Sequence, residues 1–408
     1  MEFEIRPARD DEMDQLGLMG AYSYAGAFGD GVDNVVRNSN RPEWTLCAFD
    51  GPTMATSYAA FPFTIRANGN SLAYAGISAV GTRPEYRRRG LLRTIMTQAF
   101  ADQRERGQSV AGLWASQAAI YQRYGFSLLG ANRRYCVDTV DLNFNAGVDT
   151  NAGELTVRRF AGTEALDIMK SVYRDYVAPR FGYLHRSQTM WIDTVLEETA
   201  VQGPVWVAVV YAAADEPCGY VAYTMRGDKV DNPARGQELI IRDLVWLTPQ
   251  AYPTLWSYIA RHDLVGRVVW DNAPVDDPLI ELLSEPRMAH HRDHEATWFR
   301  IVDVPQALAQ RGYTASGSIV LEVEQDSLAP WNSGRWLLQV EDGQATVEAT
   351  QKAANVQLSV KALASLFTGT RRAVDLSHWG LLTADDAALT TLDQLFATRY
   401  APHCPDHY

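Results

Sequence analysis

The chain has 408 residues, of which 47% are hydrophobic and 21% charged, a composition typical of soluble proteins with sizeable cores. This length predicts roughly two to four domains. The net charge of −12 argues against nucleic acid as a partner, because a phosphate backbone would be repelled, and it suits a cationic partner instead.

No stretch of the sequence reaches membrane-spanning length. The longest apolar run, 205–214, has the length and β-branching of a buried strand. The first residues are acidic and lead into a strand, so we expect no signal peptide. Four cysteines are scattered without paired spacing, which predicts reduced thiols in a cytoplasmic protein. They are Cys47, Cys136, Cys218 and Cys404.

Residues 1–145 alternate predicted strands and helices. After an initial strand, 9–24 has a helical pattern, and strands are predicted at 45–49 and 54–63 around the Asp50-Gly51 turn. A second hairpin signal, Asn68-Gly69-Asn70, precedes the strand that ends near Val80. Antiparallel strands, a strand-helix-strand unit and a final hairpin are expected in this segment.

A basic loop follows that strand. Three consecutive arginines, Arg87 to Arg89, stand before Gly90, and apolar residues then recur at helical spacing until Gly107. A helix N-terminus beside arginines can hold a pyrophosphate, and a glycine lets phosphates approach the backbone. The dinucleotide fingerprint and the P-loop are both absent, so we expect a different phosphate cradle. A solvated basic turn with no ligand is the alternative.

The run from Val80 to Leu92 resembles the acetyl-CoA signature of the GCN5-related N-acetyltransferases (GNAT), R/Q-x-x-G-x-G/A. Arg87 and Gly90 match it, whereas Leu92 departs from its last position. The R-R-R-G-L-L variant is similar to the Eis (enhanced intracellular survival) branch of that superfamily. The resemblance implies acetyl-CoA as cosubstrate. The cofactor-binding residues expected are Val80, Thr82, Arg87, Arg88, Gly90, Leu91 and Ser116.

A second motif lies at 110–126. A buried strand, 110–115, is followed by Ser116 as a plausible N-cap and by a short helix over 117–124. The segment from Ile120 to Phe126 resembles the I-Y-x-R-F-G-Y segment of Eis proteins, which implies that Tyr121 is the general acid protonating the CoA thiolate. A phenol with a pKa of about 10 stays protonated at neutral pH and can donate. The alternative is an aromatic side chain that only covers the sheet.

The resemblance also bears on the base and the acceptor. In Eis proteins the C-terminal carboxylate is the proposed base, and the corresponding group here is the carboxylate of Tyr408. His403 and His407 are alternative bases. The opposing interpretation is a flexible tail without a function. Related proteins build an acceptor pocket from a first-helix region. The residues expected to bind the acceptor are Tyr24, Phe28 and Asp30.

Residues 146–295 repeat the strand and helix cycle. Thr248 to Pro253 occupies the place of Thr82 to Arg87 but lacks arginine and glycine, which predicts a degenerate acetyltransferase-like domain without a CoA site. Eis proteins have the same tandem arrangement. His290 and His294 invite a metal assignment, but a polar loop before a strand explains them more simply, and no metal is expected.

From residue 296 the pattern changes to short strands. They are predicted at 297–302, 316–324, 335–340, 345–349 and 356–360, with helices at 361–367 and 384–398. This α+β module, 296–408, resembles the sterol-carrier-like domain that closes Eis chains. The predicted fold class is therefore α/β and α+β: tandem GNAT acetyltransferase-like domains followed by a sterol-carrier-protein-like α+β domain.

The Eis resemblance implies transfer of an acetyl group from acetyl-CoA to a primary amine of a cationic acceptor, of aminoglycoside type with broad regiospecificity. Two alternatives stay open: a protein-lysine or polyamine acetyltransferase, and a CoA- or lipid-binding protein with an inert transferase site. We expect no nucleic acid, membrane or metal partner. The Eis resemblance implies a homo-oligomer, a hexamer, where general experience predicts only some symmetric assembly.

Overall fold

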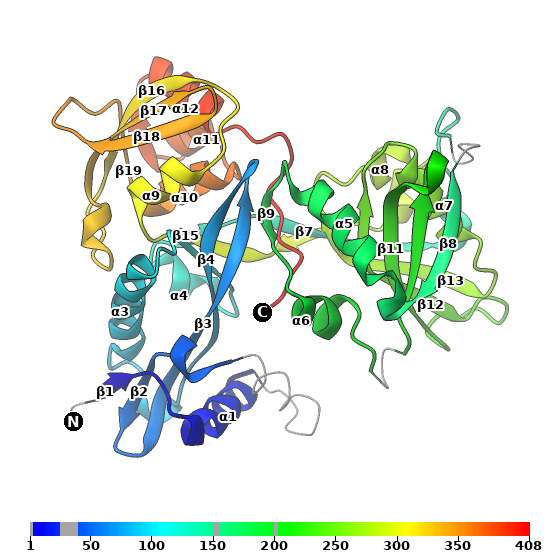
Figure 1. Ribbon diagram of the computed structural model, residues 1–408, viewed down its shortest axis with the longest axis horizontal. Helices are drawn as coiled ribbons and strands as arrows, with labels where there is room; N and C mark the ends of the chain where they lie inside the picture. The colour runs from blue at the N-terminus through cyan, green and yellow to red at the C-terminus, as the bar shows by residue number, and fades with distance from the viewer. Residues whose placement is uncertain (1–2, 25–39, 150–154, 200–202) are drawn as a thin grey trace. The chain divides into compact units, whose positions relative to one another are not determined.

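The computed structural model describes residues 3–24, 40–149, 155–199 and 203–408 (Figure 1). The chain forms two compact units. The first contains residues 1–130, 296–399 and 408, and the second contains residues 131–295 and 400–407. Within the described residues, no helix is both long and apolar enough to span a membrane. The α/β and α+β architecture predicted from the sequence is observed: an eight-stranded and a seven-stranded sheet are joined by a small five-stranded sheet near the C-terminus.

The first sheet has the strand order β1-β2-β3-β4-β5-β15-β6. Its strands are β1 (Glu4–Arg6), β2 (Cys47–Asp50), β3 (Thr53–Ala67), β4 (Asn70–Thr82), β5 (Val110–Trp114), β15 (Thr297–Ile301) and β6 (Ser127–Leu128). Neighbouring strands are antiparallel except β4 and β5, which run parallel. The helices of this domain are α1 (Met13–Tyr24), α3 (Leu91–Glu105) and α4 (Ala118–Gln122). The buried face of α3 carries the residues expected from the helical pattern, so α3 covers the sheet as predicted.

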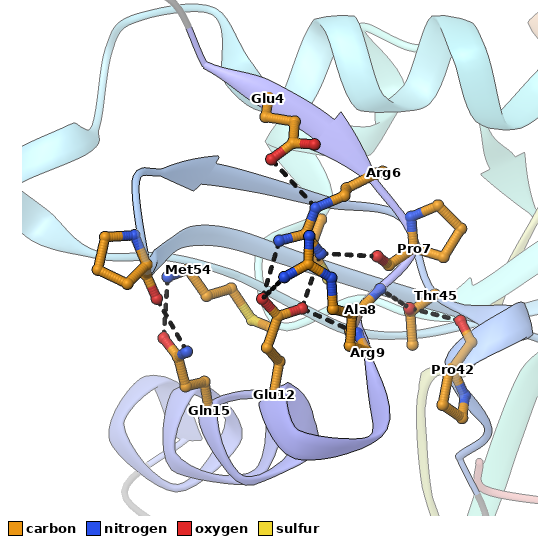
Figure 2. Close-up of polar contacts among 12 residues, drawn as sticks. Glu4, Arg6, Pro7, Ala8, Arg9, Glu12, Gln15, Pro42, Thr45 and Met54 are labelled. Carbon is orange, nitrogen blue, oxygen red and sulfur yellow. Dashed lines mark hydrogen bonds and ion pairs between the residues drawn. The ribbon is translucent and has the colours of Figure 1, made fainter.

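An ion pair fixes the entry into α1 (Figure 2). The Arg6 guanidinium donates to both carboxylate oxygens of Glu12, at 2.7 and 2.8 Å, and Glu12 also accepts from the backbone N–H of Arg9. The Arg6 charge lowers the pKa of Glu12 to about 2. Beside it, Thr45 Oγ1 accepts from the Ala8 N–H at 2.8 Å, which ties the segment after β1 to the residues preceding β2.

The sheet is completed by a strand from far along the chain. The sequence pattern assigned 297–302 to the C-terminal module, but β15 lies between β5 and β6 of the first sheet. All five residues of β15 are buried, so the strand needs cover on both faces and on both edges. The assignment to the C-terminal sheet was therefore wrong. An apolar run predicts a strand in the centre of a sheet, but it does not indicate which sheet contains the strand.

The second unit contains a seven-stranded sheet, β14-β7-β13-β12-β11-β10-β8. The strands are β7 (Ala131–Asp138), β8 (Thr156–Ala161), β10 (Trp206–Tyr211), β11 (Pro217–Arg226), β12 (Gln237–Trp246), β13 (Val265–Pro274) and β14 (Arg292–Glu295). Strand β7, which falls within the predicted first domain, pairs here with β13 and β14. The domain limits at 145 and 295 stay predictions.

Two helices cover opposite faces of this sheet. Alternate residues of β10 belong to two different cores: Val207 and Val209 pack with α5 (Leu166–Val177), whereas Ala208 and Val210 pack with α7 (Ala251–Ala260). The unit also contains β9 (Phe181–Leu184), α6 (Gln188–Met190) and α8 (Leu279–Leu282). Helix α6 is followed directly by a π-helical turn, Trp191–Val195.

The C-terminal module belongs to the first unit and has the strand order β18-β17-β16-β19-β20. Its elements are α9 (Val304–Gln310), β16 (Gly317–Val323), β17 (Gly334–Glu341), β18 (Gln344–Ala349), β19 (Val356–Leu358), α10 (Val360–Thr368), α11 (Ala373–His378), β20 (Leu382–Ala384) and α12 (Asp386–Leu395). A buried arginine, Arg311, closes the module, donating at 2.8 and 2.9 Å to the carbonyls of Phe367 and Phe396. These carbonyls lie at the C-terminal ends of α10 and α12, where a cation is favoured.

Candidate active site

Strands β4 and β5 separate beside the arginine loop. Their parallel pairing ends at Ile77 and Leu113, while β4 continues to Thr82. Against β3, one extra residue is accommodated in β4 between Ser78 and Gly81, and Ala79 there has a left-handed φ of 50°. The Ser57 hydroxyl donates to the Ala79 carbonyl at 2.7 Å and holds this bulge. The bulge turns β4 away from β5 and leaves room for an extended ligand between them.

The arginine loop ends in an open helix N-terminus. Arg88 and Gly90 both have left-handed backbones, with φ of 64° and 79°. A Cβ placed on Gly90 would meet no atom within 4 Å, so the backbone there faces open space. Helix α3 begins at Leu91 without a side-chain cap, and Arg87, Arg88 and Arg89 are exposed around it. Exposed N–H groups, a helix dipole and arginines form a donor set that fits a diphosphate.

A cavity of about 500 Å³ joins these features. It is lined by all seven residues predicted to bind the cofactor: Val80, Thr82, Arg87, Arg88, Gly90, Leu91 and Ser116. Tyr121 lines the same cavity. The structure thus brings together two motifs that lie about thirty positions apart in the sequence. Their roles in binding and catalysis remain predictions.

Two further arginines line this cavity, and the sequence interpretation did not single them out. Arg93 belongs to the first turn of α3, and Arg123 follows α4. The position of Arg93, three residues after Gly90, could have identified it, because i and i+3 positions share one face of a helix. Arg123 carried no comparable signal, although it lies inside the Ile120–Phe126 motif.

Tyr121 is held firmly in the wall of the cavity. It lies on α4, its side chain is buried, and its ring contacts that of Phe126 edge to face at 5.9 Å between centroids. The Tyr121 carbonyl accepts from the N–H groups of Tyr124 and Phe126, which closes the turn after α4. A second phenol, Tyr124, lines the same cavity, and partial burial raises its pKa. The structure therefore offers two tyrosines whose contributions can be compared.

The last residue of the chain is anchored on β4. The Tyr408 hydroxyl lies 2.5 Å from the Tyr74 hydroxyl, and the two rings meet edge to face. The Tyr408 ring also contacts Phe63 of β3 at 5.2 Å between centroids. Gly76 lies beneath this ring, since a Cβ there would come within 3.1 Å of Tyr408. Tyr408 belongs to the first unit, as Tyr121 does.

The two histidines named as alternative bases lie in the second unit. His403 is buried, and its backbone N–H donates to the Phe181 carbonyl at 3.0 Å. Burial, assisted by the positive charge of Arg180, lowers the pKa of His403 to about 3. Burial also lowers the pKa of His407. An imidazole with such a low pKa is neutral at pH 7 but a poor proton acceptor.

The predicted acceptor residues are only partly described. Tyr24 is the last residue of α1, and Phe28 and Asp30 lie outside the described residues. This assignment stays a prediction. The histidine-rich segment 290–295 was predicted to be a polar loop, but Arg292–Glu295 forms the edge strand β14 paired with β7. Over the part of the chain that the structure describes, no three His, Cys, Asp or Glu side chains are placed to hold a metal.

The corresponding turn of the second unit differs from the arginine loop. Helix α7 starts at Ala251, whose N–H is accepted by Thr248 Oγ1 at 3.3 Å, and Gln250 before it has an ordinary helical backbone. The arginines and the left-handed glycine of the first domain have no counterpart at 248–252. That this turn holds no diphosphate stays a prediction.

Comparisons with known proteins agree with this fold and site. Residues 4–129 and 182–301 each match an acetyltransferase (GNAT) domain family, and residues 304–405 match the sterol carrier protein domain. GNAT acetyltransferases use acetyl-CoA. Two acetyltransferase domains with a terminal sterol-carrier domain therefore define a tandem N-acetyltransferase.

Individual relatives show to which family of N-acetyltransferases the chain belongs. The N-acetyltransferase Eis of Mycobacterium tuberculosis is 32% identical over 334 residues, covering 80% of this chain and 79% of that protein. An uncharacterized N-acetyltransferase of Streptomyces avermitilis is 31% identical, covering 88% of both chains. The crystal structure of Eis1 from Mycobacterium abscessus superposes with a TM-score of 0.81 at 25% identity, covering 99% of this chain and all of that one. The chain belongs to the Eis family of N-acetyltransferases.

Proposed function

We propose that this acetyltransferase transfers the acetyl group of acetyl-CoA to a primary amine of a small cationic acceptor. The arginine loop would bind the cosubstrate, and Tyr121 would act as the general acid. One observation carries the proposal: the open N-terminus of α3, the arginines around Gly90 and the Tyr121 side chain all line a single cavity. A solvated basic turn with no ligand would not require the left-handed Gly90 facing open space or the divergence of β4 from β5.

Binding would use backbone and side-chain groups together. The loop from Arg87 to Leu91 would hold the diphosphate, with Arg87 and Arg88 as side-chain contacts. Backbone groups of Val80 and Thr82 would pair with the extended arm of the cosubstrate as an added strand does. Ser116, which precedes α4, also lines this cavity.

When bound, acetyl-CoA supplies an acetyl thioester that a neutral amine can attack. A backbone N–H of the strand holding Val80 would stabilise the negative charge that develops on the carbonyl oxygen. The Tyr121 hydroxyl would donate its proton to the departing sulfur, so that the C–N bond forms as the C–S bond breaks. The amine must lose one proton to a base on the acceptor side.

The α-carboxylate of Tyr408 is the proposed base. The Tyr74 and Phe63 contacts hold the ring of Tyr408 on the sheet that carries the bulge, and this supports a defined position for the terminus. A carboxylate with a pKa of about 3.5 is a weak base in water, so a relaying water or partial desolvation must assist it.

The acceptor class rests on charge and on family membership. The net charge of −12 favours a polycation, and an aminoglycoside with several primary amines is the acceptor we propose, modified at more than one position. Family membership supports a homo-oligomer, a hexamer. The scattered cysteines support the cytoplasm as its location. Protein-lysine and polyamine acceptors share this chemistry, and the experiment below separates them.

Thiol release from acetyl-CoA against kanamycin, neomycin, spermidine and a lysine peptide tests the proposal. We expect turnover on several aminoglycosides, with a loss of at least about a hundredfold in Tyr121→Phe. Tyr124→Phe is the matched control, because Tyr124 lines the same cavity. Turnover on peptide or spermidine alone would move the acceptor to the second class. Equal losses in both variants would remove the specific role of Tyr121.

A further inference from the structure

The second unit contains a second cavity, lined by several charged side chains. It measures about 320 Å³ and is lined by residues of β11, β12 and β13. The tail residues 405–407 and Arg186 form its walls. None of its lining residues lines the cavity around Tyr121. Its charges are unusual because arginines dominate a chain that is acidic overall.

The two carboxylates in the lining already have cationic partners. Asp406 accepts from Arg186 at 2.7 Å, and Arg186 also donates to Asp243 at 2.5 Å. The buried Arg186 guanidinium lies over the rings of Tyr173 and Trp191, so its position is fixed. Asp271 is paired with Arg134 at 2.9 Å. These acidic groups are therefore engaged and do not neutralise the remaining arginines of the cavity.

Arg226 and Arg242 are those remaining arginines. They come from the neighbouring strands β11 and β12 and both line the cavity. Arg226 Nε is buried and, among the described residues, has no hydrogen-bond partner. Arg242 donates to the Thr194 carbonyl. Burial lowers the pKa of Arg242, and the charge of Arg226 lowers it further, against an opposing effect of Glu197.

A buried guanidinium N–H without a partner costs free energy, and two neighbouring cations repel each other. An oxyanion relieves both costs at once, since guanidinium groups bind phosphate and carboxylate through paired hydrogen bonds. Thr224 and Asn272 in the lining supply further polar groups. The volume lies at the lower end of ligand pockets, which suits a small metabolite and not a polymer.

We propose that this cavity is a binding site for a small oxyanion, the phosphate or carboxylate group of a metabolite, held by Arg226 and Arg242. The site is separate from the proposed acetyl transfer and does not depend on it. Because Pro405, Asp406 and His407 form part of its wall, a bound anion would order the segment that directly precedes Tyr408.

Calorimetric titration of the full chain with inorganic phosphate, and separately with citrate, tests the proposal. Saturating CoA is present throughout, so that the arginine loop of the first domain is blocked. We expect binding of at least one of the two probes, weakened at least about tenfold in Arg226→Gln and in Arg242→Gln. Arg226→Lys should bind the probe more tightly than Arg226→Gln does, because lysine keeps the positive charge although it lacks the paired N–H donors of the guanidinium group.

Arg174→Gln is the matched control, since Arg174 lies exposed on α5 of the same unit. Thermal unfolding of each variant shows whether it folds. Binding by phosphate alone or by citrate alone identifies the group that the site prefers. Absence of binding by both probes, affinity unchanged in both arginine variants, or an equal loss in Arg174→Gln would overturn the proposal.

Discussion

The hydroxyl groups of Tyr74 and Tyr408 lie 2.5 Å apart although 334 positions separate the two residues in the chain. Tyr74 belongs to β4 and is fully buried, so its hydroxyl has a fixed position on the sheet that leads to the bulge at Ala79. This hydrogen bond attaches the Tyr408 side chain to the first acetyltransferase sheet.

Tyr74→Phe should lower kcat about fivefold and leave the KM for acetyl-CoA unchanged, because a hydrogen bond worth about 1 kcal/mol no longer holds Tyr408. Steady-state kinetics measure both constants. Tyr58→Phe is the control, since it removes a similarly buried hydroxyl that binds Gln103 at 2.7 Å elsewhere in the domain. If the two variants lose activity equally, the Tyr74 contact has no special role.

Deleting Tyr408 alone should cut turnover at least about tenfold while acetyl-CoA still binds, because the terminal carboxylate would then be displaced from the sheet. Calorimetry measures cosubstrate affinity, and thiol release measures turnover. Tyr408→Phe keeps the carboxylate and should lose less than the deletion. An unchanged rate after deletion would eliminate the terminal carboxylate as the base.

Gly90→Asp should weaken acetyl-CoA binding at least about tenfold, because the new carboxylate would project where the diphosphate approaches. Gly51→Asp is the matched control: Gly51 has a left-handed φ of 58° and also faces open space. Both substitutions strain the backbone, so both should lower stability slightly. Calorimetric titration that finds tight binding retained in Gly90→Asp would contradict the placement of the cosubstrate.

Arg311→Met should destabilise the C-terminal module by about 3–5 kcal/mol, because the buried carbonyls of Phe367 and Phe396 would lose their donor. Burial lowers the pKa of Arg311 to about 10, so the side chain is still charged at pH 7. Urea unfolding followed by circular dichroism measures the change. Arg372→Met, at the exposed start of α11, should change the stability far less, because its ion pair with Asp375 is exposed to solvent.

Asp277 predicts a pH dependence of stability. Burial raises its pKa to about 7, although Oδ1 accepts from the Tyr252 hydroxyl at 2.7 Å. The folded chain therefore holds this proton to higher pH than the unfolded chain, whose Asp pKa is about 3.9. The stabilisation is fully present below about pH 4, decreases by up to about 4 kcal/mol as pH rises to about 7, and then stays constant.

Asp277→Asn should flatten that slope. Urea unfolding at several values between pH 4 and pH 8 compares the variant with the natural chain. Asp263→Asn, an exposed carboxylate of the same unit, should leave the slope unchanged. Parallel slopes in the natural chain and in Asp277→Asn would show that Asp277 is not responsible.

Sequence patterns predicted the local parts of the site well. The helical spacing of Leu91 to Phe100 and the turn at Gly90 are both set by residues that are neighbours in the chain. Strand β15 could not be placed in this way, because five buried residues in a row fit the centre of any sheet. The Tyr74–Tyr408 contact was equally out of reach, since no periodic pattern connects the two positions.

Edge strand β14 shows a third limit of prediction from the sequence. Its four residues are all exposed and polar, so the sequence predicted a loop. The strand forms because β7 presents backbone groups along its edge that pair with residues 292–295. Backbone pairing of this kind depends on the neighbouring strand and leaves no mark in side-chain polarity.

The position of β15 has a consequence for biosynthesis. Its partners β5 and β6 leave the ribosome well before residues 297–301 are made, and the whole second sheet is translated in between. Until then, both neighbouring strands expose edges that can pair with other chains. A nascent fragment that ends before Thr297 is therefore expected to bind chaperones or aggregate, and the first sheet is completed late in translation.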